Sequence, residues 1–121
     1  MPDFDQLARR YIDSWNETDP TARRAAVDDL WADGARYTDP LASVEGRDEI
    51  DATIAAVQGQ FPGFVFRLVG PVDAHHDQCR FAWELGPHDG EAPVAGFDVA
   101  VVGPDDKLRT VLGFLDRVPA G

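Results

Sequence analysis

The chain has 121 residues, of which 44% are apolar and 10% aromatic, enough to bury one core and too apolar for a disordered polymer. Its 22 acidic and 11 basic residues give a net charge of -11, which repels phosphate backbones and anionic lipid surfaces. This balance excludes nucleic acid and membranes as expected partners and favours a small molecule. We expect one domain over residues 1–121.

The cysteine content and the N-terminal segment indicate the cellular compartment in which the protein is expected. Cys79 is the only cysteine, so an internal disulfide is excluded and a reducing compartment is permitted. The first ten residues carry acids and have no apolar stretch of signal-peptide length, and no run approaches a membrane span. We therefore expect a cytoplasmic protein.

Two helices are predicted at the start of the chain. The apolar residues of the first recur at three- and four-residue spacing: Phe4, Leu7, Ala8, Tyr11, Ile12 and Trp15. Asp3 and Gln6 form a capping pair at its start, and Asp19 followed by Pro20 begins the second helix. The apolar face of that helix comprises Ala22, Ala26, Val27, Leu30 and Trp31. We expect it to end at residues 32–34.

A short strand and a third helix follow. Residues 35–39 include Tyr37 and stop at Pro40, which predicts a strand that ends in a turn. A loop is expected over residues 41–45. From Gly46 the apolar residues return to a helical period, and the glycines and proline of residues 59–63 end that helix.

The rest of the chain has a period of two, which predicts strands. Their expected ranges are 64–72, 79–85, 94–102 and 108–118, with turn-rich separators at 73–77, 86–90 and 103–106. Four strands in succession joined by short turns form an antiparallel meander. Helices followed by such a meander predict an α+β fold in which helices cover one face of a curved sheet.

Three segments resemble the nuclear transport factor 2 superfamily, in particular its SnoaL-like and ketosteroid-isomerase-like branches. They are YIDSWNETD at 11–19, ARYTDPLASVEGRDEI at 35–50 and GFDVAVVGPDDKLRTVLGFLD at 96–116. With the element order, they cover almost the whole chain. The resemblance implies a cone-shaped NTF2-like (cystatin-like) fold, with three N-terminal helices packed on a curved, mostly antiparallel sheet. It also implies a cavity for a hydrophobic small molecule, no cofactor, and a homodimer formed through the outer face of the sheet.

The resemblance also implies catalytic roles. Ketosteroid isomerase uses a carboxylate base to move a proton between carbons and two neutral donors to stabilise the enolate. Asp39 is similar to the base, Tyr11 to the phenol donor and Asp98 to the protonated acid donor. SnoaL-like polyketide cyclases need only an aspartate in an apolar cavity, a role that either acid fits. Relatives of limonene-epoxide hydrolase have an arginine where this chain has Gly96, so their site looks incomplete here.

Each of these residues also has a purely structural interpretation. Asp39 before Pro40 is a good turn residue. The alternation that places Phe97 on the more densely packed side of its strand sends Asp98 to solvent, and only the resemblance turns it toward a cavity. Tyr11 lies four residues before Trp15, which is typical of core packing. A ligand-binding or dimerisation module without chemistry is therefore the alternative function.

The aromatic residues are expected mostly in the core, with a subset at the cavity wall. Trp83 and Phe114 are favoured for the wall, and the full set assigned to it is Trp15, Tyr37, Phe61, Trp83 and Phe114. The three histidines fall in predicted turns without a partnering cluster of acids, so no metal site is expected.

Overall fold

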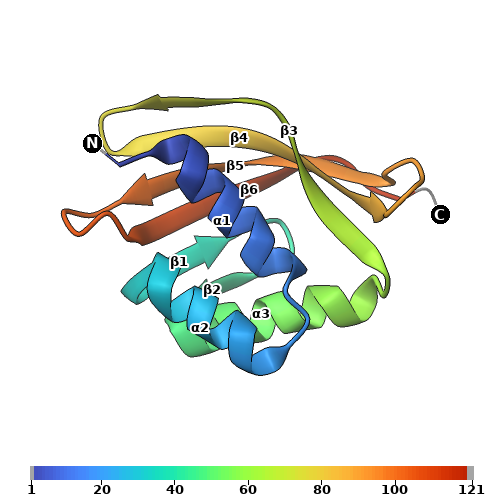
Figure 1. Cartoon of the computed structure of the whole chain (residues 1–121), viewed down its shortest axis with the longest axis horizontal. Helices are drawn as coiled ribbons and strands as arrows, with labels where there is room; N and C mark the ends of the chain where they lie inside the picture. The colour runs from blue at the N-terminus through green and yellow to red at the C-terminus, as the bar shows by residue number, and fades with distance from the viewer. Residues whose placement is uncertain (1, 120–121) are drawn as a thin grey trace.

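The computed structural model describes residues 2–119 and places three helices against one face of a six-stranded mixed sheet (Figure 1). The helices are α1 (Phe4–Asn16), α2 (Pro20–Leu30) and α3 (Arg47–Gln60). The strands are β1 (Trp31–Thr38), β2 (Ser43–Glu45), β3 (Phe64–His75), β4 (Gln78–Pro87), β5 (Val94–Val102) and β6 (Leu108–Arg117). The α+β class and the predicted meander of β3 to β6 are confirmed. Among residues 2–119, no helix has the length and apolarity needed to cross a membrane.

The strand order is β2-β1-β6-β5-β4-β3, with β1 parallel to β6 and the other neighbours antiparallel. This order places β5 inside the sheet. On one side Asp98 pairs with Phe81 of β4, and on the other with Gly113 of β6. Paired residues point to the same face of a sheet. The residues beside Asp98 on the helix-covered face are therefore a phenylalanine and a glycine.

The predicted caps of the first two helices are confirmed. Asp3 Oδ1 accepts a hydrogen bond from the backbone N–H of Gln6 at 3.1 Å. Asp19 Oδ2 accepts one from the N–H of Ala22 at 2.9 Å. Each bond satisfies a backbone donor that has no partner inside its helix. The two helix starts are thus fixed locally.

An aromatic cluster fastens α1 to the sheet. The Tyr11 ring centroid lies 5.5 Å from that of Phe81 and 6.1 Å from that of Trp31. The Trp15 ring lies 5.5 Å from both Tyr37 and Phe66. All the predicted apolar residues of this helix are buried. The sequence therefore identified this face correctly.

The boundary between α2 and β1 differs from the prediction. The helix ends at Leu30, and β1 begins directly at Trp31 instead of at residue 35. The glycine expected to end the helix, Gly34, has φ 74° and lies where the pairing of β1 with β6 shifts register. Trp31 is buried as a strand residue, and Ala22, expected on the apolar face, is exposed. Residues 43–45, expected as loop, form β2.

A buried arginine links the helices. Arg23 is only 7% exposed; its Nε donates to Asp51 Oδ1 at 2.9 Å and its Nη1 to Gln58 Oε1 at 3.1 Å. Gln58 Nε2 donates in turn to the backbone carbonyls of Trp15 and Glu17, at 3.0 and 2.7 Å. These bonds tie α2 and α3 to the end of α1.

The β3–β4 hairpin is tighter than predicted. Residues 73–75, expected in the connecting turn, continue β3, and the turn consists of His76 and Asp77. His76 has φ 55°, a backbone conformation that short hairpin turns require. A bulge between Val69 and Asp73 interrupts the pairing of β3 with β4. Bulges increase strand bending, which is consistent with the curved sheet in Figure 1.

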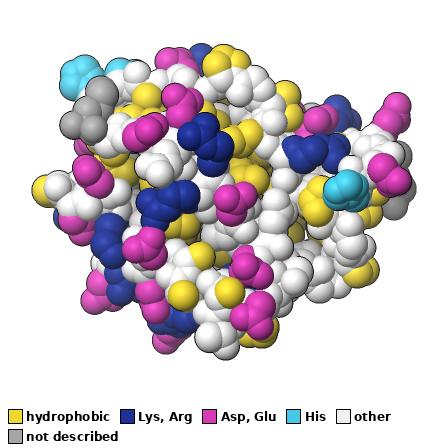
Figure 2. Space-filling model, in the orientation of Figure 1, with side chains coloured by type: hydrophobic (Ala, Val, Ile, Leu, Met, Phe, Trp, Pro, Cys, Tyr) yellow, Lys and Arg dark blue, Asp and Glu magenta, His cyan; other side chains and the backbone are white. Residues whose placement is uncertain are grey.

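The surface shown in Figure 2 carries acidic and basic side chains interspersed with one another. Several belong to ion pairs: Arg10 contacts Asp29, and Arg24 contacts Asp28 at 2.9 Å and Asp48 at 2.6 Å. Because these groups are solvent-exposed, their pairs contribute little to stability.

Candidate functional site

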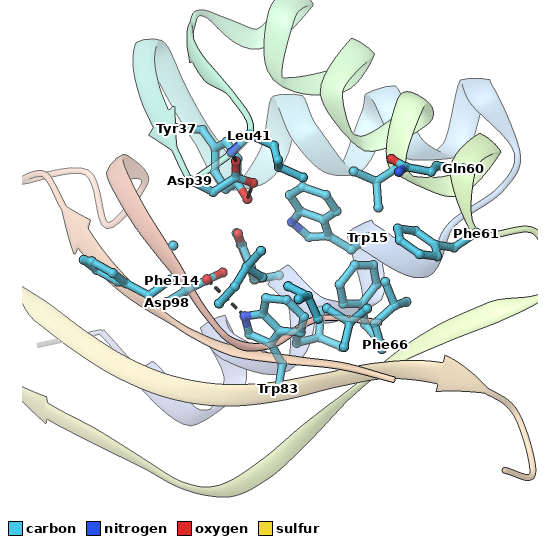
Figure 3. Close-up of a pocket in the computed structure, with 18 of the residues that line it drawn as sticks. Trp15, Tyr37, Asp39, Leu41, Gln60, Phe61, Phe66, Trp83, Asp98 and Phe114 are labelled. Atoms are coloured by element: carbon cyan, nitrogen blue, oxygen red, sulfur yellow. Dashed lines mark hydrogen bonds between the residues drawn. The ribbon is translucent and has the colours of Figure 1, made fainter. Parts of the chain in front are cut away.

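A cavity of about 400 Å³ lies between α1, the C-terminal end of α3 and the inner face of the sheet (Figure 3). Its wall is mainly apolar and aromatic. The lining residues are Tyr11, Ile12, Trp15, Tyr37, Asp39, Leu41, Val57, Gln60, Phe61, Phe66, Trp83, Leu85, Val94, Asp98, Gly113, Phe114, Leu115, Val118 and Pro119. Every residue that the sequence assigned to catalysis or to a pocket wall therefore borders one cavity. Asp39 and Asp98 lie at one end of it, and Gln60 and Phe61 at the other.

Asp98 is a buried acid on the inner face of β5, with 3% of its surface exposed. Its Oδ1 accepts a hydrogen bond from Trp83 Nε1 at 3.0 Å. Burial raises the pKa of Asp98 to about 6, because the ionised carboxylate loses its hydration. The donors of Trp83 and Tyr11 oppose this rise in pKa, and the charge of Asp39 adds to it. Asp98 can thus exchange a proton close to neutral pH.

The alternation argument from the sequence was wrong for this strand. The buried set on β5 is Val94, Gly96, Asp98, Ala100 and Val102, whereas Phe97 and Val99 are only partly buried. The more apolar set therefore faces outward. Of this set, Val94 and Asp98 line the cavity, whereas Gly96 lies against the Trp83 ring, whose Cζ2 would be 2.9 Å from a Cβ atom there.

Asp39 lies in the turn after β1 and also borders the cavity. Its Oδ1 accepts hydrogen bonds from the N–H groups of Leu41 and Ala42, both at 2.8 Å. Its Oδ2 accepts a third from Tyr37 Oη at 2.6 Å. The turn interpretation describes the contacts of Oδ1, and Asp39 also lines the cavity. The two interpretations of Asp39 are compatible.

Tyr37 has a larger part in this site than the sequence suggested. It was assigned only to the wall, but its hydroxyl is bonded to Asp39, two residues later. Burial raises the pKa of Tyr37 far above its ordinary value, with further contributions from the charge of Asp98 and the bond to Asp39. The phenol therefore stays protonated and donates. The signal in the sequence was the spacing of two along a strand, which puts both side chains on one face.

Tyr11 brings a second phenol to the same end of the cavity. It is 2% exposed, and its pKa is raised well above the ordinary value, first by burial and then by the charge of Asp98. Its hydroxyl lies near the Asp98 carboxyl, yet it makes no hydrogen bond of normal geometry to any of residues 2–119. The phenol therefore stays protonated beside the Asp98 carboxyl.

Gly113 marks the place where these groups converge, and the sequence analysis did not single it out. A Cβ atom at this position would lie 3.0 Å from Asp98 Oδ1, 3.2 Å from Asp39 Cβ and 3.6 Å from Tyr37 Oη. The two acids and one phenol thus surround the same point on β6. The missing side chain keeps that point open.

Phe114 borders the cavity, but its ring lies on the other face of the sheet from Asp98. It pairs with Phe97 across β5 and β6, and the two rings stack with centroids 5.0 Å apart. It is 49% exposed on the outer face. Trp83, the other favoured residue, packs inward with its ring centroid 5.3 Å from that of Phe66. Nowhere in residues 2–119 do three His, Cys, Asp or Glu side chains gather as metal ligands.

The fold and sequence match known proteins over most of the chain. The family model of the SnoaL-like domain matches residues 8–111. A candidate isomerase of the SnoaL-like family from Agrobacterium tumefaciens is 40% identical in sequence, with a TM-score of 0.88 over 92% of this chain and 95% of that one.

Two other similar structures are more distant and show the fold alone. A candidate SnoaL-like polyketide cyclase from Jannaschia is 20% identical, with a TM-score of 0.74 over 92% of this chain and 83% of that one. A candidate polyketide cyclase from Sinorhizobium meliloti is 15% identical, with a TM-score of 0.71 over 93% and 94%. No curated protein matches. The family match and the 40% identity confirm the resemblance seen in the sequence: the chain belongs to the SnoaL-like family, with an NTF2-like fold.

Proposed function

We propose that this protein is a cofactor-free isomerase or cyclase that moves a proton on an apolar, steroid- or polyketide-like carbonyl compound. One observation carries the proposal: two carboxyl groups in different environments border the same apolar cavity. Asp39 is held by three donors, whereas Asp98 is buried with a pKa of about 6. Acids whose environments differ in this way are suited to separate acid and base roles. The names of the similar structures, an isomerase and two cyclases, agree with this chemistry.

Asp39 acts as the base in the proposed mechanism. Its carboxylate takes a proton from the carbon next to the carbonyl, and the electron pair left behind moves onto the carbonyl oxygen. Tyr11 and protonated Asp98 donate hydrogen bonds to that oxygen. Isomerisation is completed when Asp39 returns the same proton to another carbon. In a cyclisation, the enolate carbon instead attacks a second carbonyl of the same molecule, whose oxygen takes the proton.

The pH dependence of kcat/KM separates two roles for Asp98. If protonated Asp98 donates to the substrate oxygen, activity falls as pH rises through its pKa of about 6. The protonated fraction then drops roughly tenfold between pH 5 and pH 7. If ionised Asp98 is the base, as the cyclase alternative allows, kcat/KM rises over the same interval. A profile with neither trend excludes both roles.

The test of the mechanism is Asp39→Asn, assayed with 5-ene-3-ketosteroids and simple polyketide mimics. Asparagine still offers an oxygen to the amides of Leu41 and Ala42, so the melting temperature should change little. Without a base, turnover should fall by about 100-fold or more. The exposed acid Asp33 provides a control of equal charge, Asp33→Asn. Equal activity of Asp39→Asn and wild type removes Asp39 from the mechanism; ligand binding without turnover favours the non-catalytic module.

We also propose that two copies of the chain pair through the outer face of the sheet. Phe97 and Phe114 stack there, and Leu112 and Val69 are 40% and 42% exposed. Apolar side chains gathered on a surface favour association. Sedimentation equilibrium should show a dimer for wild type and a shift to monomer for Leu112→Glu. A wild-type monomer at all concentrations contradicts the pairing.

A further inference from the structure

The cavity meets solvent where its lining residues are exposed. Apart from Phe114, whose ring lies on the outer face of the sheet, these come from three places in the chain: Leu41 in the turn after β1, Gln60 at the end of α3, and Val118 and Pro119 after β6. Phe61, next to Gln60, is partly buried and also lines the cavity (Figure 3). We call Leu41, Phe61 and Val118 the apolar rim.

The apolar rim includes the most exposed large hydrophobic side chains of the described chain. Leu41 is 80% exposed and Val118 is 59% exposed, more than any other large apolar residue among residues 2–119. Both line the cavity, whereas the exposed Val69 and Leu112 do not. An apolar side chain in water gains free energy when another apolar group covers it. The rim is therefore suited to contact an apolar molecule.

The turn that carries Leu41 is fixed to the acidic end of the cavity. Asp39 Oδ1 accepts hydrogen bonds from the N–H groups of Leu41 and Ala42, and the Asp39 N–H donates to the Ala42 carbonyl at 2.8 Å. Leu41 is thus held two residues from the proposed base, whereas Phe61 lies at the other end (Figure 3). The rim therefore follows the opening from one end of the cavity to the other.

The volume of the cavity limits the part of a ligand that it encloses. It is about 400 Å³. A non-hydrogen atom with its hydrogens takes up roughly 20–30 Å³ in a packed organic phase, as a water molecule does in the liquid. The cavity thus holds on the order of 15 non-hydrogen atoms, the size of two or three fused rings. A larger steroid- or polyketide-like ligand extends past the opening and lies against the rim.

The charge of the site indicates what the protruding part of a ligand is. Among the described residues that line the cavity, the only charged side chains are those of Asp39 and Asp98, and there is no Lys, Arg or His. The whole chain has a net charge of -11. A carboxylate or phosphate near the opening would be repelled and would find no cation to pair with. The protruding part is therefore neutral.

A second copy of the chain is the other molecule that could cover the apolar rim. Stable pairing of two proteins buries roughly 800 Å² of surface on each partner. Leu41 and Val118 are two side chains at an opening, and they present far less apolar surface than that. A ligand already seated in the cavity needs only this small area, because each carbon that it covers adds affinity. A ligand is therefore the better fit.

We propose that the apolar rim binds the outer part of a substrate that is longer than the cavity, a neutral ketone carrying an alkyl chain or a further ring. The assignment rests on the proposed function, which places the ketone beside Asp39 and Asp98. It adds the class of substrate to that function. Leu41 and Val118 are then specificity-determining residues, and neither takes part in proton transfer.

The test compares three 1-tetralones: the unsubstituted ketone, one with an octyl chain at C6 opposite the ketone, and one whose C6 chain has the same length and ends in a carboxylate. Isothermal titration calorimetry at pH 7.5 gives their affinities. Wild type should bind the octyl ketone at least about tenfold more tightly than the unsubstituted one, and the carboxylate more weakly than the octyl ketone. Equal affinity for the two neutral ketones overturns the proposal, as does binding of neither or tighter binding of the carboxylate.

Variants of the rim show whether it is the part of the protein that holds the chain. In the double variant Leu41→Ser, Val118→Ser the ratio of octyl to unsubstituted affinity should fall roughly tenfold. Leu112→Ser changes an exposed leucine away from the cavity and should keep the wild-type ratio. A ratio preserved in the double variant overturns the proposal. Sedimentation equilibrium should give the double variant the mass of wild type; a lower mass assigns the rim to a second copy and also overturns it.

Methyl NMR provides a measurement on the wild-type side chains. With ¹³C-labelled leucine and valine methyl groups, the octyl ketone should shift the Leu41 and Val118 signals more than the unsubstituted ketone does, and leave those of Leu112 in place. Rim signals unmoved by bound octyl ketone overturn the proposal even if the double variant does not fold. A retained preference for the octyl chain without turnover of either ketone supports the rim and contradicts only the proposed function.

Discussion

Replacing Asp98 with asparagine should make the protein more stable, by an amount that depends on pH. Burial raises the pKa of this acid from its ordinary value of 3.8 to about 6 in the folded protein. Between those two pH values the folded state binds more protons than the unfolded state. The free energy of unfolding of the wild type therefore falls as pH rises through this window. Above it, the full cost of burying the carboxylate is present.

The size of the effect follows from the two pKa values. A difference of about two pH units corresponds to a loss on the order of 3 kcal/mol above pH 7. The loss shrinks to less than about 1 kcal/mol at pH 4, where wild-type Asp98 is protonated in the folded state and about half protonated in the unfolded state. Asparagine cannot ionise, and its side-chain oxygen can still accept from Trp83 Nε1. Asp98→Asn should therefore gain most stability at pH 8 and least at pH 4.

Urea denaturation followed by circular dichroism at pH 4, 5, 6 and 8 measures this difference directly. Comparing the variant with wild type at each pH cancels the contribution of the other acids. Asp33→Asn, at an exposed acid, should show no comparable trend. A stability difference between Asp98→Asn and wild type that is constant with pH would refute the buried-carboxylate argument. So would a variant less stable than wild type at pH 8.

Two further substitutions test neighbours of the site. Tyr37→Phe removes the 2.6 Å hydrogen bond to Asp39. In steady-state assays kcat/KM should fall roughly tenfold, while the melting temperature changes little. Unchanged kcat/KM excludes Tyr37 from positioning the base. Gly96→Ala places a Cβ atom against the Phe114 carbonyl oxygen and 2.9 Å from Trp83 Cζ2. Urea denaturation should show a free energy of unfolding about 1–3 kcal/mol lower than that of wild type. An unchanged free energy of unfolding would show that β6 can shift to make room for the added Cβ atom.

The sequence was most informative where structure depends on nearby residues. The buried face of α1 repeats every three or four residues, and its start at Asp3 is set by a bond that spans three positions. The β3 to β6 meander was predictable because short turns join successive strands. Such features need only the local chain.

The predictions failed where pairing between distant segments decided the structure. β1 begins at Trp31 because it pairs in parallel with β6, more than 70 residues later in the chain, and local periodicity does not record that contact. The prediction that Asp98 faces solvent, made from the alternation along β5, failed for a related reason. The outer face of this strand is also apolar, as the stacking of Phe97 on Phe114 shows, so hydrophobicity alone did not identify the inner face. The resemblance to a family supplied that information instead.

The sequence predicted only some of the residues that meet at the acidic end of the cavity. Tyr11, Asp39 and Asp98 were named because a family pattern connects them, but no pattern named Gly113 or the bond from Tyr37. Both depend on the pairing of β1 with β6 and of β6 with β5, which brings residue 113 beside both acids. A glycine in a strand is a recognisable signal of close approach, and it was available in the sequence.

The position of Asp98 argues for function over packing. Its neighbours on the inner face are apolar or small, and its ionised form is penalised by burial. Asparagine would keep the bond to Trp83 and remove that penalty, so stability alone does not explain an acid here. Gain of stability together with loss of turnover in Asp98→Asn would show that the carboxyl group serves chemistry. Gain of stability with full turnover would instead remove the Asp98 carboxyl group from the proposed mechanism.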